Sequence, residues 1–225
     1  KGDFGISEML MKFYDGKQGQ SIKEILKNGE NEFEKNFLNL IKGLDEFPSS
    51  ESDKLKKLLI SVLKMGKESM QIIALELDNQ DISVSKFENE TGIRPRILNN
   101  IKAPNVVLQI LELVSEKSNI SNIDIETYFG LKENASNKEI ARKLTIQEKV
   151  NAIYYMLNFL GYYRDIKMKN EQRFRASFSD MTHAGIASFC DIFLSGDENL
   201  ILKTYAAYEY LGVYTEIWKY KDNKF

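Results

Sequence analysis

The sequence is poor in the residues that build several common kinds of site. It has one cysteine, Cys190, which excludes a disulfide within the chain, and one histidine, His183. One residue of each type cannot build a zinc site from the usual cysteine and histidine ligand sets. A single cysteine also fits a reducing compartment, so we expect a cytoplasmic protein.

The sequence also lacks a charge bias and a long apolar run. Its formal net charge is −2, so any contact with nucleic acid needs a local basic patch. No apolar run has transmembrane length and no secretory signal pattern is found, so we expect no membrane contact. The chain starts at Lys1 rather than at a methionine, which predicts that residues precede it.

Helical periodicity extends over most of the first two thirds of the chain. Apolar residues recur at helical spacing over about 21–44, with a break expected near Gly29, and again over about 53–77. The second of these helices is expected to carry a single apolar side, formed by Leu55, Leu58, Leu59, Val62, Leu63, Met70 and Ile73.

Two more helical patterns follow. Thr145 and Glu148 form the pattern of a capping box, which predicts a helix that ends at Gly161. The range 81–119 predicts helix, turn and helix, an order also found in DNA-reading motifs. Its second helix, "NVVLQILELV", has no basic residue to face phosphate, so we favour ordinary packing.

The pattern changes after Tyr163. "DIFLS" is typical of a strand buried on both faces, "DENLILKTYAAYEYLG" of a helix ending at Gly212, and "VYTEI" of a second strand. The order helix, strand, helix, strand implies a parallel crossover. The expected fold class is therefore α/β and helix-rich overall.

Two aspartates bracket the first predicted strand. Asp180 stands near the start of "SDMTHAGIASFC", where Ser179 or Asp180 is the expected helix N-cap, and Asp197 follows the strand. Ligand sites in parallel sheets form at the carboxyl ends of strands. Each aspartate could cap a helix or bind a metal ion, and the two roles do not exclude one another.

The stretch 177–217 resembles the C-terminal part of PIN-like domains, a family of metal-dependent ribonucleases. The similarity is to a bacterial subgroup with the motifs D-x-x-H-A, C-D-x-F-x-[ST]-x-D, K-x-x-x-x-Y and T-x-[IV]. "FLGYYRD" at 159–165 resembles the turn that precedes these motifs. The matching residues are Asp180, His183, Ala184, Cys190, Asp191, Phe193, Ser195, Asp197, Lys203, Tyr208, Thr215 and Ile217.

The resemblance implies a site for Mg²⁺ or Mn²⁺ built from acidic residues. Asp180 and Asp197 match its third and fourth acids, and Ser195 matches a hydroxyl beside the metal. Glu8 is a candidate for the second acid. The first acid belongs to the end of an early strand, which residues 1–20 lack, so it would lie upstream of Lys1 or be missing.

Two other motif residues have open roles. His183 could orient a carboxylate or contact a phosphate, or be a structural histidine at a helix start. Asp191 could support the site or only form a turn between helix and strand.

A local basic cluster precedes Asp180. Cations interleaved with aromatic residues form grooves for single-stranded RNA, although a solvated loop is the plainer interpretation. Lys203 could add a phosphate contact or lie on an exposed helix face. The basic residues of the cluster are Arg164, Lys167, Lys169, Arg173 and Arg175.

The resemblance also predicts the organisation of the chain and its function. Residues 1–20 would begin a PIN-like core with a parallel sheet, and 166–225 would complete it. The helical segment 21–165 would be an insertion that acts as a cap, a homo-oligomer surface or a lid that binds a protein partner. The implied function is a Mg²⁺- or Mn²⁺-dependent endoribonuclease, such as a bacterial toxin or antiviral defence effector. The alternative is an inactive PIN-like scaffold whose helical region binds a protein.

Overall fold

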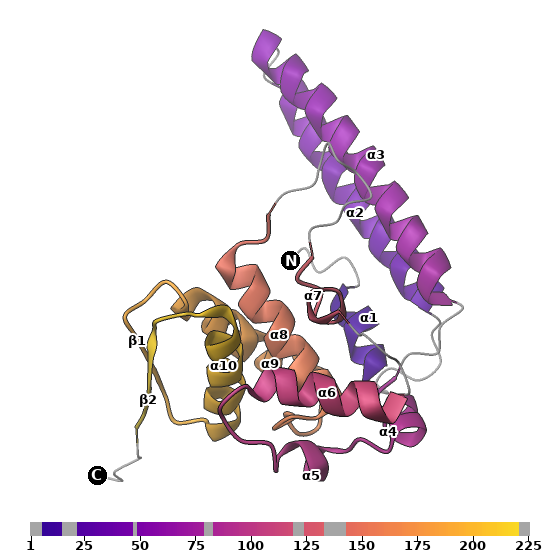
Figure 1. Cartoon of the computed structure of the whole chain (residues 1–225). Helices are drawn as coiled ribbons and strands as arrows, with labels where there is room; N and C mark the ends of the chain where they lie inside the picture. Colours follow the sequence, from indigo (N-terminus) through magenta and orange to yellow (C-terminus); the bar gives the residue numbers. More distant parts are fainter. Residues whose placement is uncertain are drawn as a thin grey trace. The chain divides into compact units, whose positions relative to one another are not determined.

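The computed structural model describes residues 6–14, 22–46, 49–78, 83–118, 124–132 and 143–220. The chain divides into two compact units, 1–83 and 84–225. The division lies inside the range 21–165, which the sequence predicts as one helical segment. The described residues are mostly helical and include one two-stranded parallel sheet, so the expectation of a helix-rich α/β protein is confirmed at that level (Figure 1).

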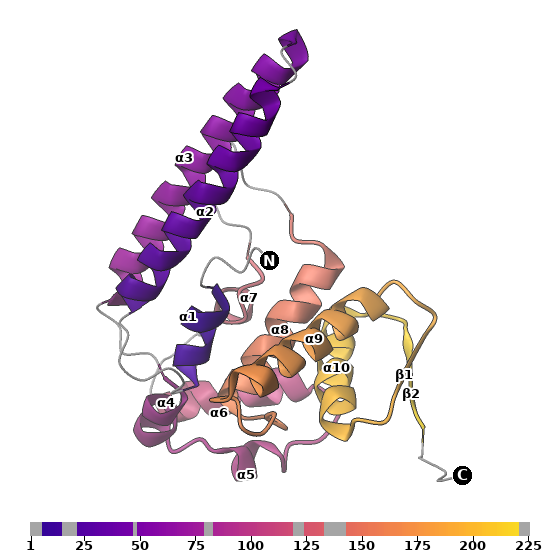
Figure 2. The same ribbon diagram turned by 180° about the vertical axis from the view of Figure 1, so that it is seen from behind.

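The first unit contains a long helical hairpin. The described helices of this unit are α1 (Ile6–Phe13), α2 (Ile22–Asp45) and α3 (Ser50–Asp78). Helices α2 and α3 form the hairpin, and both views show them side by side (Figures 1 and 2). Helix α2 passes through the buried Gly29 without interruption, so the break expected there is wrong. A glycine inside a helix costs only about 1 kcal/mol, which packing on a second helix outweighs.

Ion pairs and one close contact set the register of the hairpin. Lys67 Nζ lies 2.9 Å from Glu34 Oε2, and Lys56 Nζ lies 2.7 Å from Asp45 Oδ1, as two antiparallel helices require. A Cβ on Gly66 would lie 2.5 Å from the Phe33 ring, so glycine permits this close approach.

The apolar residues of α3 do not form the single side that the sequence predicts. Leu63 is 9% exposed, whereas Leu55, Leu58 and Val62 are 43%, 59% and 39% exposed. The expected side is therefore divided between a stripe that faces α2 and a second, exposed stripe.

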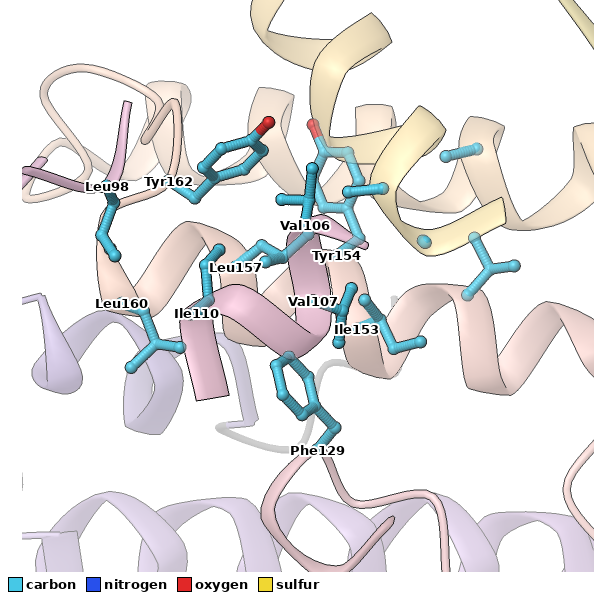
Figure 3. Close-up of a cluster of buried hydrophobic side chains, with 14 of the residues drawn as sticks. Leu98, Val106, Val107, Ile110, Phe129, Ile153, Tyr154, Leu157, Leu160 and Tyr162 are labelled. Carbon is cyan, nitrogen blue, oxygen red and sulfur yellow. The ribbon is translucent and has the colours of Figure 1, made fainter. Parts of the chain in front are cut away.

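In the described part of the second unit, seven helices and the sheet pack around an apolar core. Its elements are α4 (Val84–Thr91), α5 (Pro95–Leu98), α6 (Val106–Ser118), α7 (Ile125–Tyr128), α8 (Ile146–Leu160), α9 (Glu171–Ala187), β1 (Ile192–Ser195), α10 (Glu198–Leu211) and β2 (Glu216–Lys219). Figure 3 shows Ile110 of α6 beside Leu157 and Leu160 of α8, and all three are fully buried. Helix α6 thus contributes to the core, as the packing interpretation predicts. Within the described ranges, no helix is long and apolar enough to cross a membrane.

The termini of α8 confirm the sequence prediction, and the start of α9 does not. The Thr145–Glu148 capping box is present, and Gly161 ends α8 in the left-handed conformation with φ 115°. Helix α9 begins at Glu171, where the Asn170 side chain accepts a hydrogen bond from the Arg173 N–H. Asp180 therefore lies inside a helix, and its predicted role as an N-cap is wrong.

The two strands pair in parallel and bury one face. Phe193 lies opposite Ile217, and both pack against the core. On the other face, Ile192, Leu194 and Trp218 are 46%, 57% and 53% exposed. In both views, no other described element of this unit covers that face (Figures 1 and 2). The expected burial of β1 on both faces is therefore wrong for the described residues.

Candidate active site

A pocket lies along β1 and extends past its carboxyl end to the following turn. Its volume is about 640 Å³. Helix α9 contributes Asp180 and His183 to its lining, and the end of β1 and the following turn contribute Ser195 and Asp197. The fold thus brings together four of the site residues that the resemblance to PIN-like domains suggests, at the edge of the sheet where ligand sites form.

Asp180 is a half-buried carboxylate with no hydrogen bond or ion pair to any described residue. Burial raises the pKa of Asp180 above its ordinary value of 3.8, and the charges of Asp165 and Asp197 raise it further. The positive charges of His183 and Lys203 oppose this shift. An added cation in the pocket would remove the repulsion between the carboxylates.

Asp197 has two roles in the local structure of the pocket. Its Oδ1 atom accepts a hydrogen bond of 3.0 Å from the Leu200 N–H, so it caps α10 as one sequence interpretation predicts. Its own N–H donates to Ser195 Oγ at 3.1 Å, which ties the turn to the last residue of β1. The cap uses Oδ1, and Oδ2 makes no hydrogen bond within the described part of the chain.

A buried ion pair lies next to these carboxylates. The Lys203 side chain is 0% exposed, and its Nζ lies 2.8 Å from Asp165 Oδ1. The ammonium also donates to Asn158 Oδ1 at 2.9 Å and lies 4.5 Å from the centre of the Tyr154 ring. Lys203 is thus neither on an exposed helix face nor at a surface open to phosphate, and both sequence interpretations of it are corrected.

Asp165 connects the ion pair to the neighbouring helices. Its Oδ2 accepts a hydrogen bond of 2.5 Å from Ser177 Oγ on α9, and its N–H donates to Asn158 Oδ1 on α8. Burial lowers the pKa of Lys203, and the charges of Asp165, Asp197 and Asp180 oppose that shift. The network therefore joins α8, α9 and α10 within electrostatic reach of both pocket aspartates.

Sequence reasoning missed Asp165 and Asn158 as parts of the site. A usable signal was present, because Asp165 ends the "FLGYYRD" segment and Lys203 belongs to a motif of the same resemblance.

Two further motif residues prove structural. Tyr208 donates to the Ala184 carbonyl at 2.6 Å, and Thr215 donates to the Cys190 carbonyl at 2.7 Å.

The structure gives different information on the other two predicted acids, Asp191 and Glu8. Asp191 is exposed and does not line the pocket, and its carbonyl accepts a hydrogen bond of 2.9 Å from Glu216 N–H at the start of β2. Glu8 lies on α1, in the first unit, and its side chain is outside the described part of the structure. His183, by contrast, is exposed in the middle of α9, so the interpretation of a histidine at a helix start is wrong.

The predicted basic cluster divides into structural and exposed residues. Arg164 lies 2.6 Å from Glu88 and donates to the carbonyls of Asn158 and Phe159, so it closes the turn after α8. The others are exposed, with Arg175 paired to Glu171 on the same helix. Arg173 precedes Asp180 by seven residues, which places both on one side of α9, about 10 Å apart. The exposed residues are Lys167, Lys169, Arg173 and Arg175.

The pocket fits a divalent cation only as an open site. Among the described residues, no group of three or more histidine, cysteine, aspartate or glutamate side chains is placed to hold a metal ion. Of the residues that the structure describes, Asp180 and Asp197 supply the carboxylates of the pocket lining. Mg²⁺ commonly binds through one or two carboxylates, keeps several waters and takes further oxygens from a substrate phosphate. The two aspartates fit that mode and do not fit a closed, all-protein site.

No family model, curated protein or solved structure matches this chain. The resemblance to PIN-like domains therefore rests on the motif residues, most of which lie around the pocket and in the contacts behind it.

Proposed function

We propose that the pocket is the active site of a PIN-like nuclease that hydrolyses RNA with Mg²⁺ or Mn²⁺. Asp180 and Asp197 would hold the cation, and Asp180 carries the proposal. A half-buried carboxylate without a protein partner is costly, and a divalent cation is a partner that removes this cost. Such an ion supplies the activation of a water molecule for phosphodiester hydrolysis.

The residues of the chain have separate tasks in this proposal. Asp197 holds one carboxylate oxygen in the α10 cap, which fixes the position of the other oxygen for the cation. The Lys203–Asp165 pair keeps α9 and α10 in place behind the two ligands. His183 is exposed at the pocket, where it can contact a phosphate of the substrate.

Exposed cations support RNA as the substrate. Lys167, Lys169 and Arg173 lie on the turn before α9 and on its first turn. Arg173 lies on the same side of α9 as Asp180. A strand whose backbone passes Arg173 could therefore continue to the pocket, with each contact adding a salt-dependent part of the affinity.

Cleavage of end-labelled single-stranded RNA tests the proposal. The full chain is incubated with Mn²⁺ or with EDTA, beside Asp180→Asn, Asp197→Asn and the control Asp191→Asn. We expect metal-dependent cleavage that both pocket variants lose by at least about 100-fold, as for removal of a group that stabilises the transition state. The Asp191→Asn control should cleave at the rate of the unchanged protein. Cleavage that survives in Asp180→Asn would contradict the proposal.

The second candidate is a PIN-like scaffold without activity, whose helical region binds a protein. Its support is that, among the described residues, two carboxylates line the pocket. Under this alternative no metal-dependent cleavage occurs, and Mn²⁺ does not raise the melting temperature of the protein.

A further inference from the structure

The second apolar stripe of α3 is formed by Leu55, Leu58, Val62 and Met65. Their side chains are 43%, 59%, 39% and 40% exposed. The spacing of three, four and three residues is that of the a and d positions of a coiled coil. We call this set the α3 seam.

The α3 seam is separate from the contact between α3 and α2. Each residue turns a helix by about 100°, so the four seam residues share one side of α3. Leu63 and Gly66 lie on a neighbouring side, where Leu63 is buried and Gly66 lies against Phe33 of α2. The hairpin can therefore keep its own packing while the seam binds another helix.

We propose that the α3 seam binds the same seam of a second copy of this chain, with the two α3 helices antiparallel. The positions of the seam residues are compatible with this arrangement. When Leu58 faces Val62 of the second copy, Leu55 faces the second copy's Met65, so every seam residue has an apolar partner.

Charges beside the seam are complementary in this arrangement. Lys54 precedes the first seam residue by one position, and Glu68 follows the last seam residue by three positions. The two residues are fourteen positions apart, so they occupy the same flanking position of the heptad. In the antiparallel pair, Lys54 lies beside Glu68 of the second copy, and the twofold axis repeats the contact. Both side chains are exposed and free to turn toward a partner; Glu68 makes a loose 3.9 Å contact with Lys64. Flanking charges of this kind set the orientation of coiled coils.

The α3 seam can be tested with a matched control, because a leucine outside the seam is almost as exposed as one within it. Leu58 is 59% exposed on the seam, and Leu40 is 57% exposed on α2. Sedimentation equilibrium of the full chain should show a dimer. Leu58→Glu should weaken it roughly 100-fold, since both copies lose apolar burial, and Leu40→Glu should leave it unchanged. A protein that is monomeric at all concentrations, or equal effects of the two variants, would overturn the proposal.

Charge reversal tests the antiparallel orientation. Lys54→Glu places two glutamates together at each end of the pair and should weaken the dimer roughly three- to tenfold. The double variant Lys54→Glu with Glu68→Lys restores opposite charges and should recover the original affinity. Failure of the double variant to recover would contradict the pairing of Lys54 with Glu68.

Disulfide formation gives an independent test of the same geometry. Ser61 is exposed at the flanking position nearest the twofold axis, where it meets Ser61 of the second copy. With the exposed Cys190 changed to serine, Ser61→Cys should form a covalent dimer on mild oxidation. Lys54→Cys should not, because in an antiparallel pair its counterpart lies about 20 Å away along the helix. Equal crosslinking at both positions would indicate another arrangement. These results do not depend on the proposed nuclease activity.

Discussion

Lys203 Nζ lies 2.8 Å from Asp165 Oδ1, and none of the Lys203 side chain is exposed. The pair connects α10 to the turn between α8 and α9 and thereby supports the helices that carry Asp180 and Asp197. A buried charge is tolerated here because its partner and further hydrogen bonds are in place.

Removing one member of this pair should destabilise the second unit strongly. Lys203→Met leaves the partly buried Asp165 without its cation and should lower the free energy of unfolding by up to about 3–5 kcal/mol. Adding Asp165→Asn to Lys203→Met should recover much of that loss, because no charge is then left unpaired. The fluorescence of Trp218, the only tryptophan, follows urea unfolding of this unit. A double variant as unstable as Lys203→Met alone would show that the pair itself contributes little.

The pH dependence of stability should reveal the raised pKa of Asp180. A folded-state pKa above the unfolded value means that the folded protein holds the proton more tightly. Without metal, stability should therefore fall as the pH rises from 3.8 through the raised pKa of Asp180. Asp180→Asn should be more stable than the unchanged protein near neutral pH and equal to it below 3.8. Urea unfolding in EDTA over this range measures the difference, and a variant that is less stable at neutral pH would contradict the assignment.

The two roles of Asp197 can be separated by choice of substitution. Asp197→Ala removes the α10 cap and should cost about 0.5–2 kcal/mol of unfolding free energy. Asp197→Asn keeps an acceptor for the Leu200 N–H and should be nearly as stable as the unchanged protein. Both Asp197→Asn and Asp197→Ala should nevertheless lose RNA cleavage. Thermal melting and the RNA cleavage assay report the two effects. Cleavage retained in the asparagine variant would leave Asp197 as a cap alone.

The exposed basic residues should govern RNA affinity without governing the chemical step. Changing Lys167 and Arg173 together to alanine should weaken binding of single-stranded RNA and reduce the slope of log affinity against log salt by about 1.4, or 0.7 for each contact. The cleavage rate at saturating RNA should stay the same. Arg96→Ala with Lys117→Ala is the matched control, since both are exposed in the same unit. If the control double variant lost as much RNA affinity as the Lys167 and Arg173 double variant, RNA would bind without a defined path along the surface.

The sequence was most informative where local rules decide the structure. The capping box at Thr145, the end of α10 at Gly212 and the first strand depend on neighbouring residues, and the structure confirms them. The second strand is present but begins at Glu216, three residues later than predicted. The start of α9 was misplaced because Ser179 and Asp180 are favoured N-cap residues, yet the helix already contains Ser177. In the structure its hydroxyl is bonded to Asp165, twelve residues away.

Long-range contacts explain the other differences. Nothing near Lys203 in the sequence indicates burial, because its partners Asp165 and Asn158 come from segments about 40 residues earlier. Likewise, periodicity in α3 shows apolar positions without showing which of them face α2. The pocket itself was anticipated from the motif residues Asp180, Ser195 and Asp197, whereas the ion pair behind it was not.

Binding of Mn²⁺ to the full chain tests the central claim most directly, because it addresses the two aspartates without any assumption about the RNA sequence. The electron paramagnetic resonance signal of free Mn²⁺ gives the affinity for the unchanged protein, Asp180→Asn, Asp197→Asn and the control Asp191→Asn. We predict binding that each pocket variant weakens by at least about tenfold, as for loss of one charged oxygen ligand, and that the control retains. No binding by the unchanged protein, or equal binding by Asp180→Asn, would contradict a metal site at the end of β1.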